Sequence, residues 1–436
     1  MNGTSLVNLN AIMLIKRAVS NIKYFKLLRH SSRSMSKLRS EKKGYDEDSE
    51  ITTFLKTTLE YQIIKDNLPK MLLRKYKFPE SMYLVNKSIA KEIANTVRLY
   101  LHDDDCPIIE VNPGFCFLSR ELLNFLPNNL YLYETSNLFL HYLMLLNEEY
   151  PNRVIYKISD FFGMWKLAFQ DKMDQGNRIK ELLGTLSTED NVKIVGSMPG
   201  LSFVKHLVNN ILFHSTTNQL GRPDMFITMP GHHYMFLADD QIQLRKHKSL
   251  PALFQLLFDF KILKKFPKVH FLPWTNPPTK RMDEYCLYLV NITQKEKLPC
   301  PPEYLPLLWY FFRPHMLSNP TRVIPKLEQW IPGCGVWLIT GQDPPDTNMK
   351  LSPSDEDAKL PHMTIFTEFG DLSLQQKLTV FKRFISWPEF DQCQFRVTME
   401  NNLPKVVTAA EDDEKSSIAT PLEDIDGSGS DTECES

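Results

Sequence analysis

The residues best placed to do chemistry in this sequence lie where apolar runs end in acids and glycines. Residues 108–119 read Ile-Ile-Glu-Val-Asn-Pro-Gly-Phe-Cys-Phe-Leu-Ser, an order that predicts a strand, a tight turn and the start of a helix. In that geometry the backbone comes close to a nucleotide cofactor, and the amides at the helix N-terminus face it. A turn of this kind is also common in ordinary α/β proteins, so on its own it leaves a purely structural turn open.

Three further features follow in order and narrow the interpretation. Glu134 ends the next apolar run, 24 residues after Glu110, and an Asp-Phe-Phe sequence begins at Asp160. Residues 196–199 then read Gly-Ser-Met-Pro after another apolar run. This order resembles the rRNA adenine dimethyltransferase family, and within it the mitochondrial transcription factor B proteins. The resemblance covers roughly residues 75–275 and implies S-adenosylmethionine as the cofactor.

The family's first motif, E-x-G-P-G-x-G-x-L-T, carries much of this resemblance. The residues that fit it are Glu110, Pro113, Gly114, Leu118 and Ser119. Asn112 replaces the first glycine of the motif, as expected of the mitochondrial branch, and Cys116 replaces the second. Glycine there lets the backbone pass close to the cofactor, whereas a Cβ and a sulfur take that space. We therefore expect S-adenosylmethionine binding to be weak or absent.

The cofactor-binding residues implied by the resemblance are Leu84, Glu110, Asn112, Gly114, Glu134 and Asp160. A carboxylate at Glu134 can accept hydrogen bonds from both ribose hydroxyls, although a solvated acid at a strand end has the same signature. Asp160 can accept from the adenine amino group, with Phe161 packed on the ring, or it can cap a helix. Tyr83 and Leu84 would lie over the methionine end of the cofactor, but both also fit an ordinary core.

The family's fourth motif bears on whether the chain is an enzyme. Active members carry Asn-Leu-Pro-Tyr, in which amide and prolyl oxygens hold the adenine amino group and the aromatic ring stacks on the flipped base. Here the catalytic positions are Ser197 and Pro199, followed by Gly200. Ser197 offers one short hydroxyl, and Gly200 lacks a stacking face that is worth ~1–3 kcal/mol per base. The sequence predicts a degraded catalytic motif and leaves enzymatic activity uncertain.

Two classes of function remain open. The degraded motif favours a mitochondrial transcription initiation factor, in which the scaffold assists mitochondrial RNA polymerase in opening promoter DNA. The alternative is an S-adenosylmethionine-dependent mitochondrial adenine N6-dimethyltransferase that acts on small-subunit rRNA. An NAD-type dehydrogenase is disfavoured, because the sequence lacks the G-x-G-x-x-G fingerprint of that class.

Charge is concentrated at the two ends of the chain. Residues 1–40 hold eight Lys or Arg and no acid, with apolar residues at helical spacing, which is typical of a mitochondrial presequence over 1–43. A disordered basic arm is the alternative interpretation. Residues 411–436 hold ten acids and one Lys, so we expect an acidic disordered tail over 401–436. With the resemblance, the basic end predicts location in the mitochondrial matrix, at the nucleoid.

Between these ends, strand and helix patterns alternate. The apolar runs with strand character are 108–111, 130–134, 154–158, 192–195 and 225–228. Such alternation predicts parallel strands joined by helical crossovers. We therefore expect an α/β, class I methyltransferase-like (Rossmann-like) domain over 44–295, with a mostly parallel sheet. Prolines at 299–302 and short helical patterns beyond them predict a small, mainly helical C-terminal domain over 296–400.

Smaller features predict individual elements. A helix is expected to begin at Ser136 and to carry Leu138 and Leu145 on its apolar face. Tyr285–Ile292 alternates between apolar and polar residues, as an edge strand does. Residues 166–191 are polar, contain two glycines and resemble an insertion.

A nucleic-acid surface is expected at the densest basic groups of the folded part. Its predicted residues are Arg245, Lys246, Lys248, Lys264, Lys265, Lys280 and Arg281. Each can neutralise a phosphate, although a solvated helix face is the commoner meaning of such clusters. No metal site is expected, because the adjacent His232 and His233 point different ways and no partner spacing follows. No run approaches the ~18 apolar residues of a membrane span, so no membrane partner is expected.

Overall fold

The computed structural model describes the central part of the chain. The described residues are 68–73, 79–101, 106–126, 129–184, 186, 192–213, 221–238, 249–274, 286–313, 320–340 and 358–401. The predicted presequence at 1–43 lies outside them, as does the predicted acidic tail apart from residue 401. The domain boundaries expected from the sequence stay predictions.

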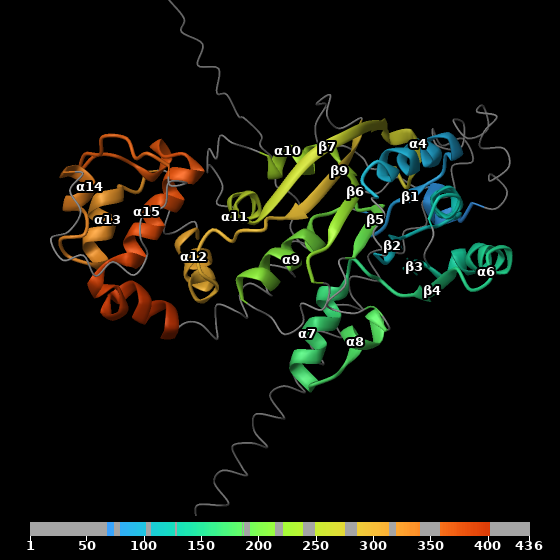
Figure 1. Cartoon of the computed structure of the whole chain (residues 1–436), viewed down its shortest axis with the longest axis horizontal. Helices are drawn as coiled ribbons and strands as arrows, with labels where there is room; N and C mark the ends of the chain where they lie inside the picture. Colours follow the sequence, from blue (N-terminus) through green and yellow to red (C-terminus); the bar gives the residue numbers. More distant parts are fainter. Residues whose placement is uncertain are drawn as a thin grey trace, which may run out of the picture. The chain divides into compact units, whose positions relative to one another are not determined.

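Within the described residues, seven strands form one sheet in the order β4-β3-β2-β5-β6-β9-β7 (Figure 1). Its strands are β2 (Ile108–Val111), β3 (Leu130–Glu134), β4 (Val154–Ile158), β5 (Lys193–Ser197), β6 (Asp224–Pro230), β7 (Phe258–Pro267) and β9 (Cys286–Gln294). Neighbours pair in parallel from β4 to β6, whereas β9 is antiparallel to both β6 and β7. This arrangement confirms the predicted class I methyltransferase-like fold.

The strands form from apolar runs because both faces of the sheet are covered. All four residues of β2 are buried, and successive side chains along a strand point to opposite faces. Ile109 and Val111 accordingly belong to one hydrophobic cluster and Ile108 to another. Two packed layers thus fix the register of β2 and of the turn that follows it.

The expectation of an edge strand at Tyr285–Ile292 is wrong. Strand β9 lies inside the sheet, between β6 and β7, and the edges are β4 and β7. Its polar residue Asn291 is buried and donates to the Asp224 carboxylate of β6 at 2.6 Å. The polar position Asn291 is therefore buried and hydrogen-bonded inside the sheet, and it does not mark a face exposed to solvent.

Helices join and follow the strands. They are α4 (Lys87–Arg98), α5 (Phe117–Leu123), α6 (Leu140–Glu149), α7 (Met164–Asp174), α8 (Arg178–Leu183), α9 (Ser202–Leu212), α10 (Gly231–Leu237) and α11 (Ser249–Leu257). Helices α7 and α8 form the crossover from β4 to β5, which corrects the expectation of an insertion over 166–191. The Arg178 guanidinium holds them together by bonding the Asp171 carboxylate at 3.1 Å and the Asp174 carboxylate at 2.6 Å.

The start and the apolar face of α6 also differ from expectation. Ser136 caps a short 3₁₀ turn, η3 (Asn137–Phe139), and α6 begins only at Leu140. Leu143 and Leu146 are its buried residues, whereas Leu138 and Leu145 are exposed. Leucines occur on more than one side of this helix, so spacing alone does not identify the packed side.

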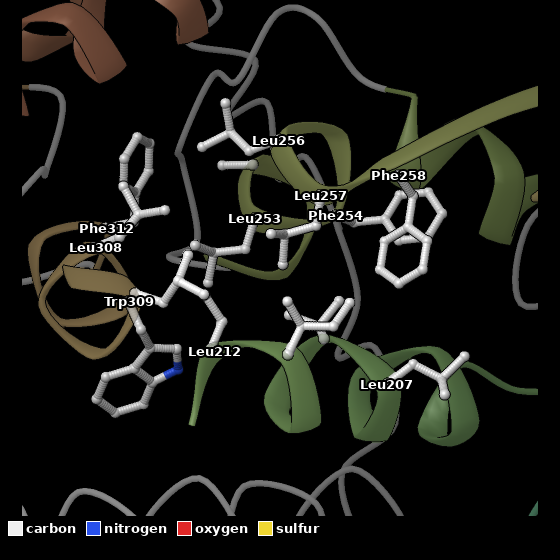
Figure 2. Packing of buried hydrophobic residues seen from close by; sticks show 14 of the residues in the cluster. Leu207, Leu212, Leu253, Phe254, Leu256, Leu257, Phe258, Leu308, Trp309 and Phe312 are labelled. Carbon is white, nitrogen blue, oxygen red and sulfur yellow. The ribbon is translucent and has the colours of Figure 1, made fainter. Parts of the chain in front are cut away.

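The C-terminal region is helical, as predicted. Its helices are α12 (Leu305–Phe311), α13 (Val323–Trp330), α14 (Val336–Thr340) and α15 (Leu374–Ser386). Figure 2 shows side chains of α9, α11 and α12 meeting in one apolar cluster. Trp309 of α12 packs edge-on against Phe213, with ring centroids 5.3 Å apart, and Phe311 packs on Phe381 of α15 at 5.2 Å. Helix α12 therefore contributes to the core on both of its sides.

Candidate functional site

The carboxyl ends of β2, β3 and β5 meet at one edge of the sheet. Val111 is in register with Tyr133 of β3 and Gly196 of β5. The residues that follow or end these strands, Asn112, Glu134 and Ser197, are therefore neighbours at the edge where open α/β sheets bind ligands. The strand order thus brings these three residues, each named as a candidate from the sequence, to one edge.

The turn after β2 adopts a left-handed backbone at three positions. The φ angles are 57° at Asn112, 55° at Gly114 and 58° at Cys116. Asn tolerates this region, and the Thr135 hydroxyl donates to the Asn112 side-chain oxygen at 2.8 Å. A Cβ on Gly114 would lie 2.9 Å from Cδ1 of Tyr83, so the turn requires glycine there. Cys116 is buried, and its sulfur packs within the hydrophobic cluster beside α5.

Glu134, the predicted ribose acceptor, is 0% exposed, and both of its carboxylate oxygens accept hydrogen bonds. Its Oε1 accepts from the Tyr83 hydroxyl at 3.0 Å and from the Ser136 amide at 2.8 Å. Its Oε2 accepts from the Gly114 amide at 3.0 Å. Burial raises the pKa of Glu134 to about 7, although these three donors act in the opposite direction.

Glu110 is in the opposite situation. It is 2% exposed, and among the described residues its Oε2 has no hydrogen-bond partner. Burial raises its pKa to about 8; the nearby Ser119 hydroxyl lowers it and the Glu134 charge raises it further. A buried acid with an unpaired oxygen is costly to ionise, so Glu110 holds its proton near neutral pH.

Asp160 forms a local turn before α7. Its Oδ1 accepts from the Gly163 amide at 2.8 Å, and its Oδ2 faces the Lys166 ammonium at 3.3 Å. Phe161 is buried against Tyr133, with ring centroids 4.9 Å apart. In this arrangement Asp160 closes the turn before α7, whose N-cap residue is Gly163, and Phe161 is a core residue.

The fourth motif follows the end of β5. Ser197 is in register with Thr228 of β6 and is 9% exposed. The Met198 amide donates to the Thr228 carbonyl at 2.9 Å, and the Met198 side chain is buried in the core. Pro199 and Gly200 are half-buried. A Cβ on Gly200 would meet no heavy atom closer than Ser202 Oγ at 4.0 Å, so the space beside this glycine is open.

Most of the predicted nucleic-acid surface, namely Arg245, Lys246, Lys248, Lys280 and Arg281, lies outside the described residues. Lys264 of β7 forms an ion pair with Glu92 of α4, and Lys265 lies over the Tyr288 ring at 4.6 Å. Across the part of the chain that is described, no group of three or more His, Cys, Asp or Glu is arranged to hold a metal ion. The same residues include no helix long and apolar enough to cross a membrane.

In this arrangement Tyr83 occupies part of the predicted ribose position at this edge. The ring of Tyr83 covers Gly114, and the Tyr83 hydroxyl takes an acceptor position on Glu134. Leu84, the other residue expected over the cofactor, is buried in the core. Sequence reasoning missed the Tyr83–Glu134 bond because the two residues are 51 positions apart and no spacing rule connects them.

Comparisons with known proteins agree with this architecture. Residues 73–336 match the family described as ribosomal RNA adenine dimethylase. The chain is 32% identical to dimethyladenosine transferase 2, mitochondrial, of Drosophila melanogaster, with 81% of this chain and 87% of the relative covered.

Two solved structures are also similar. One is the 23S rRNA methyltransferase ErmE, with a TM-score of 0.41, 13% identity, and 69% of this chain and 99% of that chain covered. The other is a dimethyladenosine transferase from Plasmodium falciparum, with a TM-score of 0.40, 12% identity, and 68% and 95% covered. Because the family match spans more than half of its length, the chain belongs to the ribosomal RNA adenine dimethylase family.

Proposed function

We propose that this chain is a mitochondrial transcription initiation factor that assists mitochondrial RNA polymerase in opening promoter DNA. Within the family it would be a transcription factor B protein of the second type, with a degraded catalytic motif and weak or absent cofactor binding. The name of the Drosophila relative supports a mitochondrial location. The basic segment 1–43 would direct import to the matrix, where the chain would act at the nucleoid. A reporter fused to this segment should reach mitochondria.

The observation that carries the proposal is the fourth motif. Ser197 stands where an amide would hold the target amine, and Gly200 itself has no side chain to stack on a flipped base; among the described residues, the nearest heavy atom to a Cβ added there would be Ser202 Oγ at 4.0 Å. Flipping a base costs a few kcal/mol, and aromatic stacking offsets ~1–3 kcal/mol of it. A scaffold that handles nucleic acid but lacks this platform is suited to melting or holding strands, and poorly suited to modifying a base.

The contact with promoter DNA would come from the basic groups. Lys264 is already paired with Glu92, and Lys265 is occupied by the Tyr288 ring, so these two offer the weaker part of the surface. The basic residues at 245–248 and 280–281 would therefore supply the main contacts to the DNA. Reversing the charges of Arg245 and Lys246 should weaken DNA binding and reduce its salt dependence, whereas reversal of Lys264 should do less.

The test is transcription by mitochondrial RNA polymerase from a duplex promoter and from the same promoter pre-melted. The polymerase should need this chain for the duplex template only. A double variant, Ser197→Asn with Gly200→Tyr, should leave promoter opening unchanged, because opening does not use the catalytic motif. Equal transcription from both templates without the chain would contradict the proposal.

The alternative is an S-adenosylmethionine-dependent adenine N6-dimethyltransferase of small-subunit rRNA. It is favoured by the position of Glu110, Gly114 and Glu134 at one sheet edge and by the name of the Drosophila relative. Mass analysis of the rRNA adenines in a methylase-deficient strain that expresses the chain distinguishes the two. Full restoration of dimethyladenosine would establish the alternative.

A further inference from the structure

Tyr83 and Glu134 form a buried hydrogen bond between side chains at the sheet edge. Tyr83 is 3% exposed, and its ring lies 4.6 Å from that of Phe139, centroid to centroid. Its backbone is held in β1 (Tyr83–Leu84), which pairs with β8 (Phe271–Leu272). The next residue, Val85, donates its amide to the His270 carbonyl at 2.9 Å. The ring lies against Gly114, and the hydroxyl donates to Glu134 Oε1.

The count of acceptor positions on Glu134 decides what else it can bind. A carboxylate oxygen offers about two lone-pair positions. On Oε1 both are used, by the Tyr83 hydroxyl and the Ser136 amide, whereas the hydrogen bond that the described residues give to Oε2 comes from the Gly114 amide. To bind both hydroxyls of a ribose, the carboxylate needs one open acceptor position on each of its two oxygens. Glu134 can therefore offer only one of the two until Tyr83 leaves.

This bond differs from that of an ordinary core tyrosine. Tyr133, on the same strand as Glu134, is also buried, and its hydroxyl donates to the backbone carbonyl of Leu182 at 2.9 Å. The Leu182 carbonyl also accepts from the Lys157 ammonium at 3.0 Å, and it is not one of the predicted cofactor-binding groups. Tyr83 instead completes a carboxylate whose position at the strand end is the one used to bind a cofactor ribose.

We propose that Tyr83 is an internal competitor for the ribose of an adenosyl ligand, so that such a ligand binds only when the Tyr83 side chain leaves Glu134. Tyr83 is thus a specificity-determining residue that keeps the cofactor site closed. This inference rests on the proposed role of Glu134 as ribose acceptor, and it deepens the proposal of weak cofactor binding. It does not depend on the role in transcription.

The decisive variant is Tyr83→Phe. It keeps the ring against Gly114 and Phe139 but removes the hydroxyl, which frees one acceptor position on Glu134 Oε1. Calorimetry of the full chain with S-adenosylhomocysteine should give affinity about tenfold higher than that of the wild type, since a hydrogen bond to a charged group no longer has to be broken. Tyr133→Phe is the matched control, because it removes a buried tyrosine hydroxyl from the same region and should leave affinity unchanged.

A second ligand separates competition for the ribose from a change in fold or in pocket size. The 2′,3′-dideoxy analogue of S-adenosylhomocysteine cannot donate to Glu134, so Tyr83→Phe should not improve its binding. Thermal unfolding of each variant verifies that it is folded.

Equal affinity of the wild type and Tyr83→Phe for S-adenosylhomocysteine would overturn the inference. So would an equal gain for both ligands, or no binding by folded Tyr83→Phe. The promoter-opening test uses the wild-type chain and no adenosyl ligand, so failure of the binding experiment is distinguishable from failure of the proposed function.

Discussion

Replacement of Glu110 by Gln should stabilise the protein at alkaline pH and leave its stability unchanged in acid. The folded-state pKa of Glu110 is about 8, against an ordinary value of 4.5, because burial disfavours its charged form. A group whose pKa is raised by folding gives stability that is fully present below about pH 4.5 and is lost as pH rises through about 8. Stability is lost because, at higher pH, the folded protein must either keep Glu110 protonated or bury its charge, and both cost free energy.

The size of the effect follows from the shift. Each pKa unit corresponds to ~1.36 kcal/mol, so the full shift is worth up to about 5 kcal/mol between the two pH limits. Glu110→Gln is neutral at every pH and keeps the shape of the side chain. The free energy of unfolding of the variant, minus that of the wild type, should therefore grow by a few kcal/mol from pH 5 to pH 9.

Urea unfolding at pH 5, 7 and 9 measures this difference. Glu134, which faces Glu110, titrates in both proteins, so its contribution largely cancels in the subtraction, and burial raises the pKa of Cys116, so this residue stays a neutral thiol from pH 5 to pH 9. Glu149→Gln is the matched control, since Glu149 is an exposed acid paired with Arg120 at 3.0 Å and should change stability by less than ~1 kcal/mol at each pH. Parallel stability curves for the wild type and Glu110→Gln would refute the reasoning that burial raises this pKa.

Three further outcomes are expected. Asn112→Ala should destabilise the fold by ~2–3 kcal/mol, because alanine is strained in the left-handed backbone and the hydrogen bond from Thr135 is lost. Thr135→Val should show only the loss of the bond. Equal effects of the two variants in urea unfolding would contradict a contribution from backbone strain. Phe311→Ala should cost ~3–5 kcal/mol, because Phe311 is completely buried between aromatic rings; a loss below ~1 kcal/mol would contradict its core role. Deletion of 411–436 should tighten non-specific DNA binding at low salt, measured by fluorescence anisotropy, with the gain disappearing at high salt; unchanged affinity would indicate a solvating appendage.

Much of the sheet could be predicted because its strands are covered on both faces. Ile108–Val111 is expected as a strand, and the same four residues form β2 and are all buried. The error at β9 arose because Asn291 is polar yet buried, and its partner Asp224 lies 67 residues away. The prediction of the buried face of α6 is wrong for a different reason, because leucines occur on both its packed and its exposed sides. Hydrophobic periodicity depends only on residues that are close in sequence. It therefore reveals neither a distant polar partner nor which of several sides of a helix is packed.

The candidate site could be predicted at the level of position but not of contact. The order of Glu110, Glu134 and Ser197 along the chain places them at one edge once the strands are parallel. What each side chain touches depends on elements that come from elsewhere. Tyr83 reaches the edge only because β1 pairs with β8, and these two short strands are separated by nearly the whole sheet in sequence.

The acids at this edge differ in what a ligand would gain from them. Glu134 already has three donors, so a ligand must first displace Tyr83. Asp160 is satisfied by the Gly163 amide and Lys166. Glu110 alone among these three carries an oxygen without a partner in the described residues, and a donor that reached it would relieve a buried unsatisfied group. A cofactor that binds all three acids would thus gain a favourable contact at Glu110 but would have to displace Tyr83 at Glu134. This imbalance is the physical reason to expect a retained methyltransferase scaffold that binds its ancestral cofactor weakly.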